Sequence, residues 1–105
     1  MTKKLHPREF KVLDAGTLPS VNEDWICVEV APGYICDLHI TYDDQGPYAL
    51  PYLCGDGEGY IRRADSLSRM SASTAFEVSD EDIWLVEDFA EHYYDTHPEK
   101  FDGEH

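Results

Sequence analysis

The chain has 105 residues, of which 22 are Asp or Glu and only 8 are Lys or Arg, so its formal net charge at pH 7 is −14. A field of this sign repels phosphates, which argues against direct binding to DNA, RNA or an anionic membrane. The length indicates one domain over residues 1–105, and a hydrophobic content of 42%, with 12% aromatic residues, argues against disorder.

Neither a membrane span nor a signal peptide is indicated by the sequence. No apolar run approaches the roughly 18 residues of a spanning helix, and the first ten residues lack the apolar stretch of a signal peptide. We therefore expect a cytoplasmic protein. Residues 1–7 and 97–105 are expected to be flexible, as chain ends commonly are.

The first half of the chain predicts β-structure. Residues 8–13 are expected to form a short strand or an extended lead-in, and residues 14–24 are rich in turn-forming residues. A hairpin follows, with strands over 25–30 and 34–42 that are rich in β-branched and aromatic residues. Gly33 in the connection is expected to adopt the left-handed conformation of a three-residue loop.

That loop fixes the register of the hairpin. The predicted pairs are Val30 with Tyr34, Val28 with Cys36 and Ile26 with Leu38. The other face then carries a mixed, partly exposed set: Trp25, Cys27, Glu29, Ile35, Asp37, His39 and Thr41. Cys27 and Cys36 point to opposite faces, and with Cys54 they make an odd number without C-x-x-C spacing. We expect three reduced cysteines, with neither a disulfide nor a zinc site.

Residues 43–59 predict a long loop that packs over the core, because four glycines and two prolines interrupt the segment. Its acidic residues offer oxygen ligands for a cation: Asp43, Asp44, Asp56 and Glu58. Their spacing does not match a calcium-binding loop, so we expect no metal and no cofactor. Beyond the loop, the sequence predicts a strand over 59–63, a helical turn over 64–70, a linker over 71–74 and a short strand over 75–78.

The clearest predicted element is an amphipathic helix from Ser79 to Asp95. Ser79 is the expected N-cap, with Asp82 as its capping-box partner, and His97-Pro98 predicts that the helix ends by Asp95 or Thr96. Seven apolar residues fall on one half of the helix: Leu85, Phe89, Tyr93, Val86, Ala90, Ile83 and Tyr94.

The other half of the helix is acidic and carries Trp84 in its middle: Glu87, Asp80, Glu91, Asp95, Asp88 and Glu81 share that half. Glu87, Glu91 and Asp95 are spaced four residues apart, so each adjacent pair costs about 0.2–0.5 kcal/mol. No Lys or Arg in the helix offsets this repulsion. An ordinary solvated face accounts for the pattern, and so does a binding surface centred on Trp84, a residue type enriched at interface hot spots.

These elements predict an α+β fold, a small antiparallel sheet of three to four strands with the C-terminal amphipathic helix packed on one face. The apolar half of the helix is expected to meet Ile26, Val28, Leu38 and Ile40.

The negative charge predicts that this protein is a small acidic inhibitor, which occupies a basic, nucleic-acid-binding surface of a partner protein. Small acidic proteins that phages and mobile elements use against restriction or CRISPR complexes have this general character, although no residue motif here carries a resemblance. The predicted partner-binding surface comprises Trp84, Glu87, Asp88, Glu91, Asp95, Asp80, Glu81, Glu29, Asp37, Asp43, Asp44, Asp56 and Glu58. The protein is expected to be a monomer, or a dimer whose acidic faces point apart.

Three alternatives remain open at the level of sequence. One is an immunity protein or antitoxin that neutralises a basic toxin. Another is an accessory domain without inhibitory function. The third is an enzyme with Cys54 as nucleophile and His39 as base, which is less favoured because a negative field disfavours the thiolate.

Overall fold

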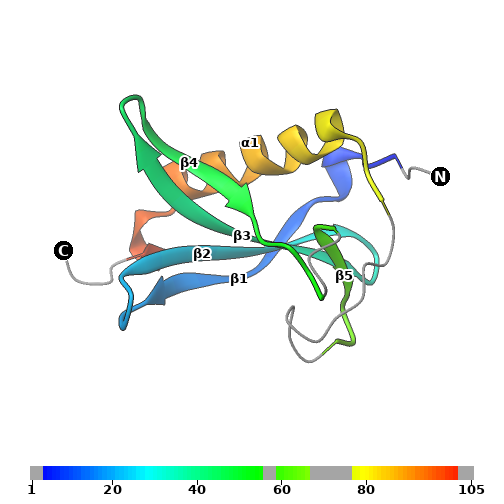
Figure 1. The fold of residues 1–105 in the computed structure, drawn as a ribbon, viewed down its shortest axis with the longest axis horizontal. Helices are drawn as coiled ribbons and strands as arrows, with labels where there is room; N and C mark the ends of the chain where they lie inside the picture. The colour runs from blue at the N-terminus through cyan, green and yellow to red at the C-terminus, as the bar shows by residue number, and fades with distance from the viewer. Residues whose placement is uncertain (1–3, 56–58, 67–76, 102–105) are drawn as a thin grey trace.

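The computed structural model describes residues 4–55, 59–66 and 77–101. A five-stranded antiparallel sheet and one long helix make up most of it, with two short 3-10 helices near the ends (Figure 1). The elements in chain order are η1 (Pro7–Glu9), β1 (Lys11–Leu18), β2 (Glu23–Ala31), β3 (Tyr34–Asp43), β4 (Gly46–Pro51), β5 (Ile61–Arg63), α1 (Asp80–Thr96) and η3 (Pro98–Phe101).

The strands follow one another across the sheet in the order β1-β2-β3-β4, and β5 pairs with the first residues of β3. The helix α1 lies across one face of this sheet and packs against β4, β2 and β3 (Figure 1). The predicted α+β fold with a C-terminal helix on an antiparallel sheet is confirmed, with five strands instead of three or four. None of the described helices is long and apolar enough to span a membrane.

One hydrophobic core fills the space between α1 and the sheet. The predicted sheet contacts of the helix are all buried: Ile26, Val28, Leu38 and Ile40. The helix contributes Ile83, Val86 and Ala90, and full burial of each large aliphatic side chain stabilises the fold by about 1.5–3 kcal/mol. Leu5 and Phe101 also belong to the core, so the segments 1–7 and 97–105, expected to be flexible, each supply a buried residue.

The central hairpin has nearly the predicted register. Ile26 pairs with Leu38 and Val28 pairs with Cys36, as predicted, but Tyr34 pairs with Ala31. The predicted pairing of Tyr34 with Val30 is wrong because the turn has only two residues, Pro32 and Gly33, and Val30 is an extra residue in β2. Gly33 has φ +85°, the left-handed conformation that the sequence predicted.

The edge strand β1 extends further than the sequence suggested. Residues 14–18 continue the strand and pair with β2, so the prediction of a turn-rich stretch over 14–24 holds only for the short connection between the strands. Gly16 faces Trp25 across the pair, and a Cβ at Gly16 would lie 3.4 Å from the indole ring. The missing side chain at this position lets the Trp25 ring lie against the strand.

The predicted long loop over 43–59 is wrong for its first half. Residues Gly46–Pro51 form β4, which pairs with β3 from Asp43↔Gly46 to Leu38↔Pro51. Prolines are tolerated in this strand because it lies at the sheet edge. Further on, β5 lies within the predicted strand 59–63, whereas the linker at 71–74 and most of the predicted elements over 64–70 and 75–78 lie outside the described residues.

Candidate protein-binding surface

The helix begins as predicted, with Ser79 as its N-cap. The Ser79 Oγ accepts a hydrogen bond from the Asp82 N–H at 3.2 Å. The Asp82 carboxylate, however, does not complete a capping box. It lies on the buried side of the helix, 2% exposed, and accepts hydrogen bonds from the Leu5 N–H at 2.9 Å and the Lys4 ammonium at 3.2 Å. Asp82 therefore attaches the N-terminal segment to α1.

The solvent-facing side of α1 carries the exposed tryptophan that the sequence singled out. Trp84 is 58% exposed. Carboxylates lie one helical turn before and after it, at Asp80, Glu81, Glu87 and Asp88. Within the described part of the chain, none of these four side chains forms an ion pair or a hydrogen bond. The same holds for Asp95 in the last turn. We call these six residues the acidic helix face.

Like charges on this face oppose one another. The pKa of Glu87 is raised above its ordinary value, first by burial and then by the neighbouring charges of Glu91 and Asp88. The negative charge of Glu87 is therefore disfavoured in the folded protein, and a cation placed beside it would relieve the repulsion.

Glu91 is on the same side of the helix but has a structural partner. Its carboxylate accepts a hydrogen bond from the backbone N–H of Ala49 at 3.0 Å. This N–H belongs to β4 at the sheet edge, where an unpaired donor would otherwise invite another strand. Glu91 thus attaches β4 to α1 and is less available to a partner than its neighbours.

The tip of the β3–β4 hairpin adds two exposed carboxylates, Asp43 and Asp44. Just before the tip, the hydroxyl of Tyr42 lies 2.5 Å from that of Tyr94 in the last turns of α1, and Tyr94 also donates to Asp24 at 3.0 Å. These bonds hold the hairpin beside the C-terminal half of the helix (Figure 1). Asp43 and Asp44 therefore extend the negative charge beyond that end of α1.

The other predicted surface residues do not join this face. Glu29 and Asp37 alternate with core residues in β2 and β3, so they point to the side of the sheet away from α1. Both are paired with cations, Glu29 with Lys11 at 3.6 Å and Asp37 with Arg62 at 2.6 Å. Asp56 and Glu58 lie outside the described residues.

We call the side of the sheet away from α1 the open face. It contains a cavity of about 250 Å³ lined by Leu18, Trp25, Ile26, Asp37, Leu38 and Tyr52. Beside the cavity, the His39 ring stacks on Tyr52 with centroids 4.7 Å apart, and its Nδ1 lies 3.2 Å from the Glu23 carboxylate. Tyr52 also donates its hydroxyl to Glu23.

The sequence predicted only part of this open face. Strand alternation placed Trp25, Asp37 and His39 there, but Leu18 and Tyr52 lie in segments predicted to be turn or loop. The proposed base His39 is engaged with Glu23 and Tyr52, and the proposed nucleophile Cys54 is fully buried. No disulfide joins Cys27, Cys36 and Cys54.

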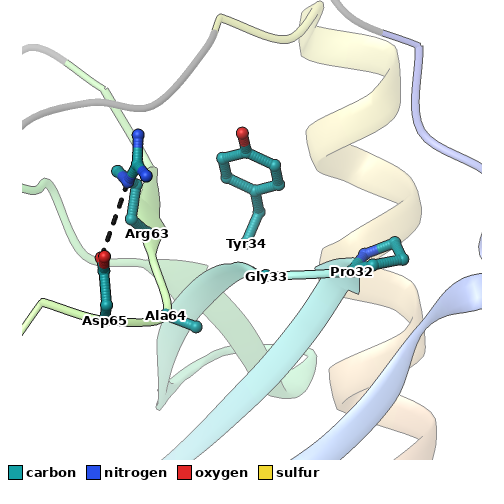
Figure 2. Close-up of a pocket in the computed structure, with 6 residues that line it drawn as sticks. All are labelled: Pro32, Gly33, Tyr34, Arg63, Ala64 and Asp65. Atoms are coloured by element: carbon teal, nitrogen blue, oxygen red, sulfur yellow. Dashed lines mark ion pairs between the residues drawn. The ribbon is translucent and has the colours of Figure 1, made fainter.

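A second cavity of about 270 Å³ lies at the β2–β3 turn, lined by Pro32, Gly33, Tyr34, Arg63, Ala64 and Asp65 (Figure 2). It forms where the Ala64 N–H donates to the Gly33 carbonyl at 2.8 Å. Figure 2 shows the Tyr34 and Arg63 side chains projecting to the same side, with Arg63 paired to Asp65 at 3.6 Å. Both members of this ion pair are exposed, so it neutralises charge without forming an enclosed site.

Metal ligation is not supported by the part of the chain that the structure describes, where no group of three His, Cys, Asp or Glu side chains is placed to hold an ion. Comparison of the chain with protein-family models, with curated proteins and with solved structures gives no significant match.

Proposed function

We propose that this protein binds a basic partner protein through the acidic helix face and inhibits it by occupying a nucleic-acid-binding surface. The observation that carries the proposal is Trp84, more than half exposed among carboxylates that have no cationic partner among the described residues. At an interface, a tryptophan surrounded by charge complementary to the partner supplies the buried anchor.

The acidic helix face is long, but its charge is sparse compared with that of a nucleic acid. From Asp80 to Asp95 the helix spans roughly 22 Å at 1.5 Å per residue, and Asp43 and Asp44 extend the charge at the hairpin tip. Duplex DNA carries one phosphate charge per about 1.7 Å of axis, so the protein replaces only a few phosphates. Trp84 then compensates for the sparse charge with apolar contact.

Two pairs of substitutions with the same change in net charge test this proposal. Glu81→Lys with Asp88→Lys reverses charge beside Trp84, whereas Asp65→Lys with Glu99→Lys reverses exposed charges elsewhere. Affinity capture from a cell lysate, with identification by mass spectrometry, should recover a basic partner with the wild type and with the second pair. The first pair and Trp84→Ala should lose it.

Nucleic acid should compete for the captured partner, and salt should weaken capture, because exposed charges are screened beyond about 8 Å at physiological ionic strength. Equal loss of capture by both charge pairs would show that only net charge matters and would contradict the proposal. If the captured partner is a toxin and nucleic acid does not displace it, the protein is instead an immunity protein or antitoxin.

A further inference from the structure

The open face of the sheet exposes apolar side chains that no element among the described residues covers. Leu18 in β1 is 45% exposed and Leu50 in β4 is 37% exposed, and the cavity of about 250 Å³ opens beside Leu18. Val21 in the β1–β2 turn and Leu53 just beyond β4 are exposed as well. Exposed apolar side chains on one face of a protein commonly mark an interface with another protein.

Charge is distributed differently on the two sides of the molecule. On the open face, Glu29 pairs with Lys11, Asp37 pairs with Arg62, and Glu23 contacts both His39 and Tyr52. Asp14 at the edge strand accepts only a backbone N–H. Of these four carboxylates, two are balanced by Lys11 and Arg62. The carboxylates of the acidic helix face, on the opposite side of the sheet, have no such partners among residues 4–55, 59–66 and 77–101. The open face therefore carries less unpaired negative charge than the acidic helix face.

We infer that the open face docks a second copy of this chain, with the two sheets face to face and the two acidic helix faces turned outward. A net charge of −14 opposes any approach of two copies, and it opposes a contact through α1 most strongly, because that contact would bring unpaired carboxylates together. A two-fold arrangement presents the same patch from each copy, so an apolar patch with few unpaired charges can pack against itself. A basic partner, by contrast, is attracted to the acidic helix face.

This arrangement predicts a salt dependence opposite to that of basic-partner binding. Raising the ionic strength from ~0.01 M to ~0.15 M shortens the screening length from about 30 Å to about 8 Å, which reduces repulsion between the two copies. The apolar contact does not depend on that screening. Self-association should therefore strengthen with salt, whereas capture of a basic protein should weaken.

Sedimentation equilibrium of the full chain tests the inference, at protein concentrations from about 1 μM to about 1 mM. Leu18→Gln with Leu50→Gln leaves the net charge unchanged and makes the open face polar. Leu85→Gln is the matched control, because Leu85 on α1 is 36% exposed, nearly the same as Leu50. The wild type and the control should dimerise equally, and the double variant should raise the dissociation constant at least ~tenfold.

A monomer across the whole concentration range at ~0.15 M salt would overturn the inference, as would a dimer that only Leu85→Gln disrupts or that is weakened by added salt. Circular dichroism verifies that each variant is folded, so that loss of the dimer is not loss of the fold. The inference does not rest on the proposed function, because dimerisation is measured without any partner protein.

Discussion

The backbone N–H of Leu5 donates to the buried carboxylate of Asp82 at 2.9 Å, and this bond joins two residues that lie 77 positions apart in the chain. Leu5 is itself a core residue, packed with the apolar side of α1. One carboxylate thus fixes both the entry of the chain into the core and the first turn of the helix.

Asp82→Ala should destabilise the fold, because it leaves the Leu5 N–H without its acceptor in a buried place. An unsatisfied buried donor costs about 1–3 kcal/mol. Asp80 lies two residues earlier in the same first turn but is exposed. Asp80→Ala removes only a favourable interaction with the helix dipole and should cost about 0.3–1 kcal/mol. Urea unfolding followed by circular dichroism compares the two variants. Equal losses would show that Asp82 acts only through the helix dipole.

The acidic helix face should make stability depend on pH through Glu87. Because its pKa is raised in the folded protein, the folded state binds more protons than the unfolded state just above pH 4.5, the ordinary value. Stability must therefore fall as the pH rises through the raised pKa of Glu87. Glu87→Gln removes this loss and one repulsive pair with Glu91, so it should stabilise the protein at pH 7 by roughly 0.2–0.5 kcal/mol.

This expectation is checked by thermal unfolding of Glu87→Gln and the wild type between pH 4.5 and neutrality. Glu99→Gln, which lies outside α1, is the control for the change of net charge. The difference between Glu87→Gln and the wild type should grow with pH. A constant difference, or the same difference for Glu99→Gln, would contradict the assigned cause. If the helix face binds a basic partner, the more stable variant should also bind it less tightly.

The helix and the central hairpin could be predicted because each is encoded by local signals. Ser79 marks the helix start, His97-Pro98 marks its end, and Gly33 marks the hairpin turn. β4 could not be predicted in the same way, because Pro47 and Pro51 oppose strand formation except at a sheet edge. Whether a strand is at an edge depends on its neighbours, which local sequence does not specify.

The buried role of Asp82 and the division of charge between the two sides of the sheet are tertiary properties. Asp82 has the same local pattern as an exposed capping residue, and only its contact with Leu5, far away in sequence, explains its burial. Likewise, Glu29 and Asp37 add to the acidic count of the chain but are paired with Lys11 and Arg62 from other strands. Composition alone therefore overstated the size of the acidic surface.

The reactivity of the Cys27 thiol on the open face tests how the charges of Asp37 and Arg62 act on its pKa. Burial, followed by the charge of Asp37 and a hydrogen bond to it, raises the pKa of Cys27 to about 12, while Arg62 acts in the opposite direction. Reaction with a thiol reagent should therefore be slow near pH 8.5, where an ordinary thiol is half ionised. Asp37→Asn removes the negative charge and leaves Arg62 in place, so the pKa should fall and labelling of Cys27 should become faster.

Peptide mapping by mass spectrometry assigns the labelled thiol, and Cys36 serves as the internal control because its complete burial keeps it unreactive in the folded state. If Asp37→Asn instead loosens the fold, Cys36 and Cys27 will be labelled together, and unfolding will account for the increase. Selective labelling of Cys27 in the variant supports the electrostatic cause. Rapid labelling of Cys27 in the wild type would contradict it, since a thiol with so high a pKa holds very little thiolate at that pH.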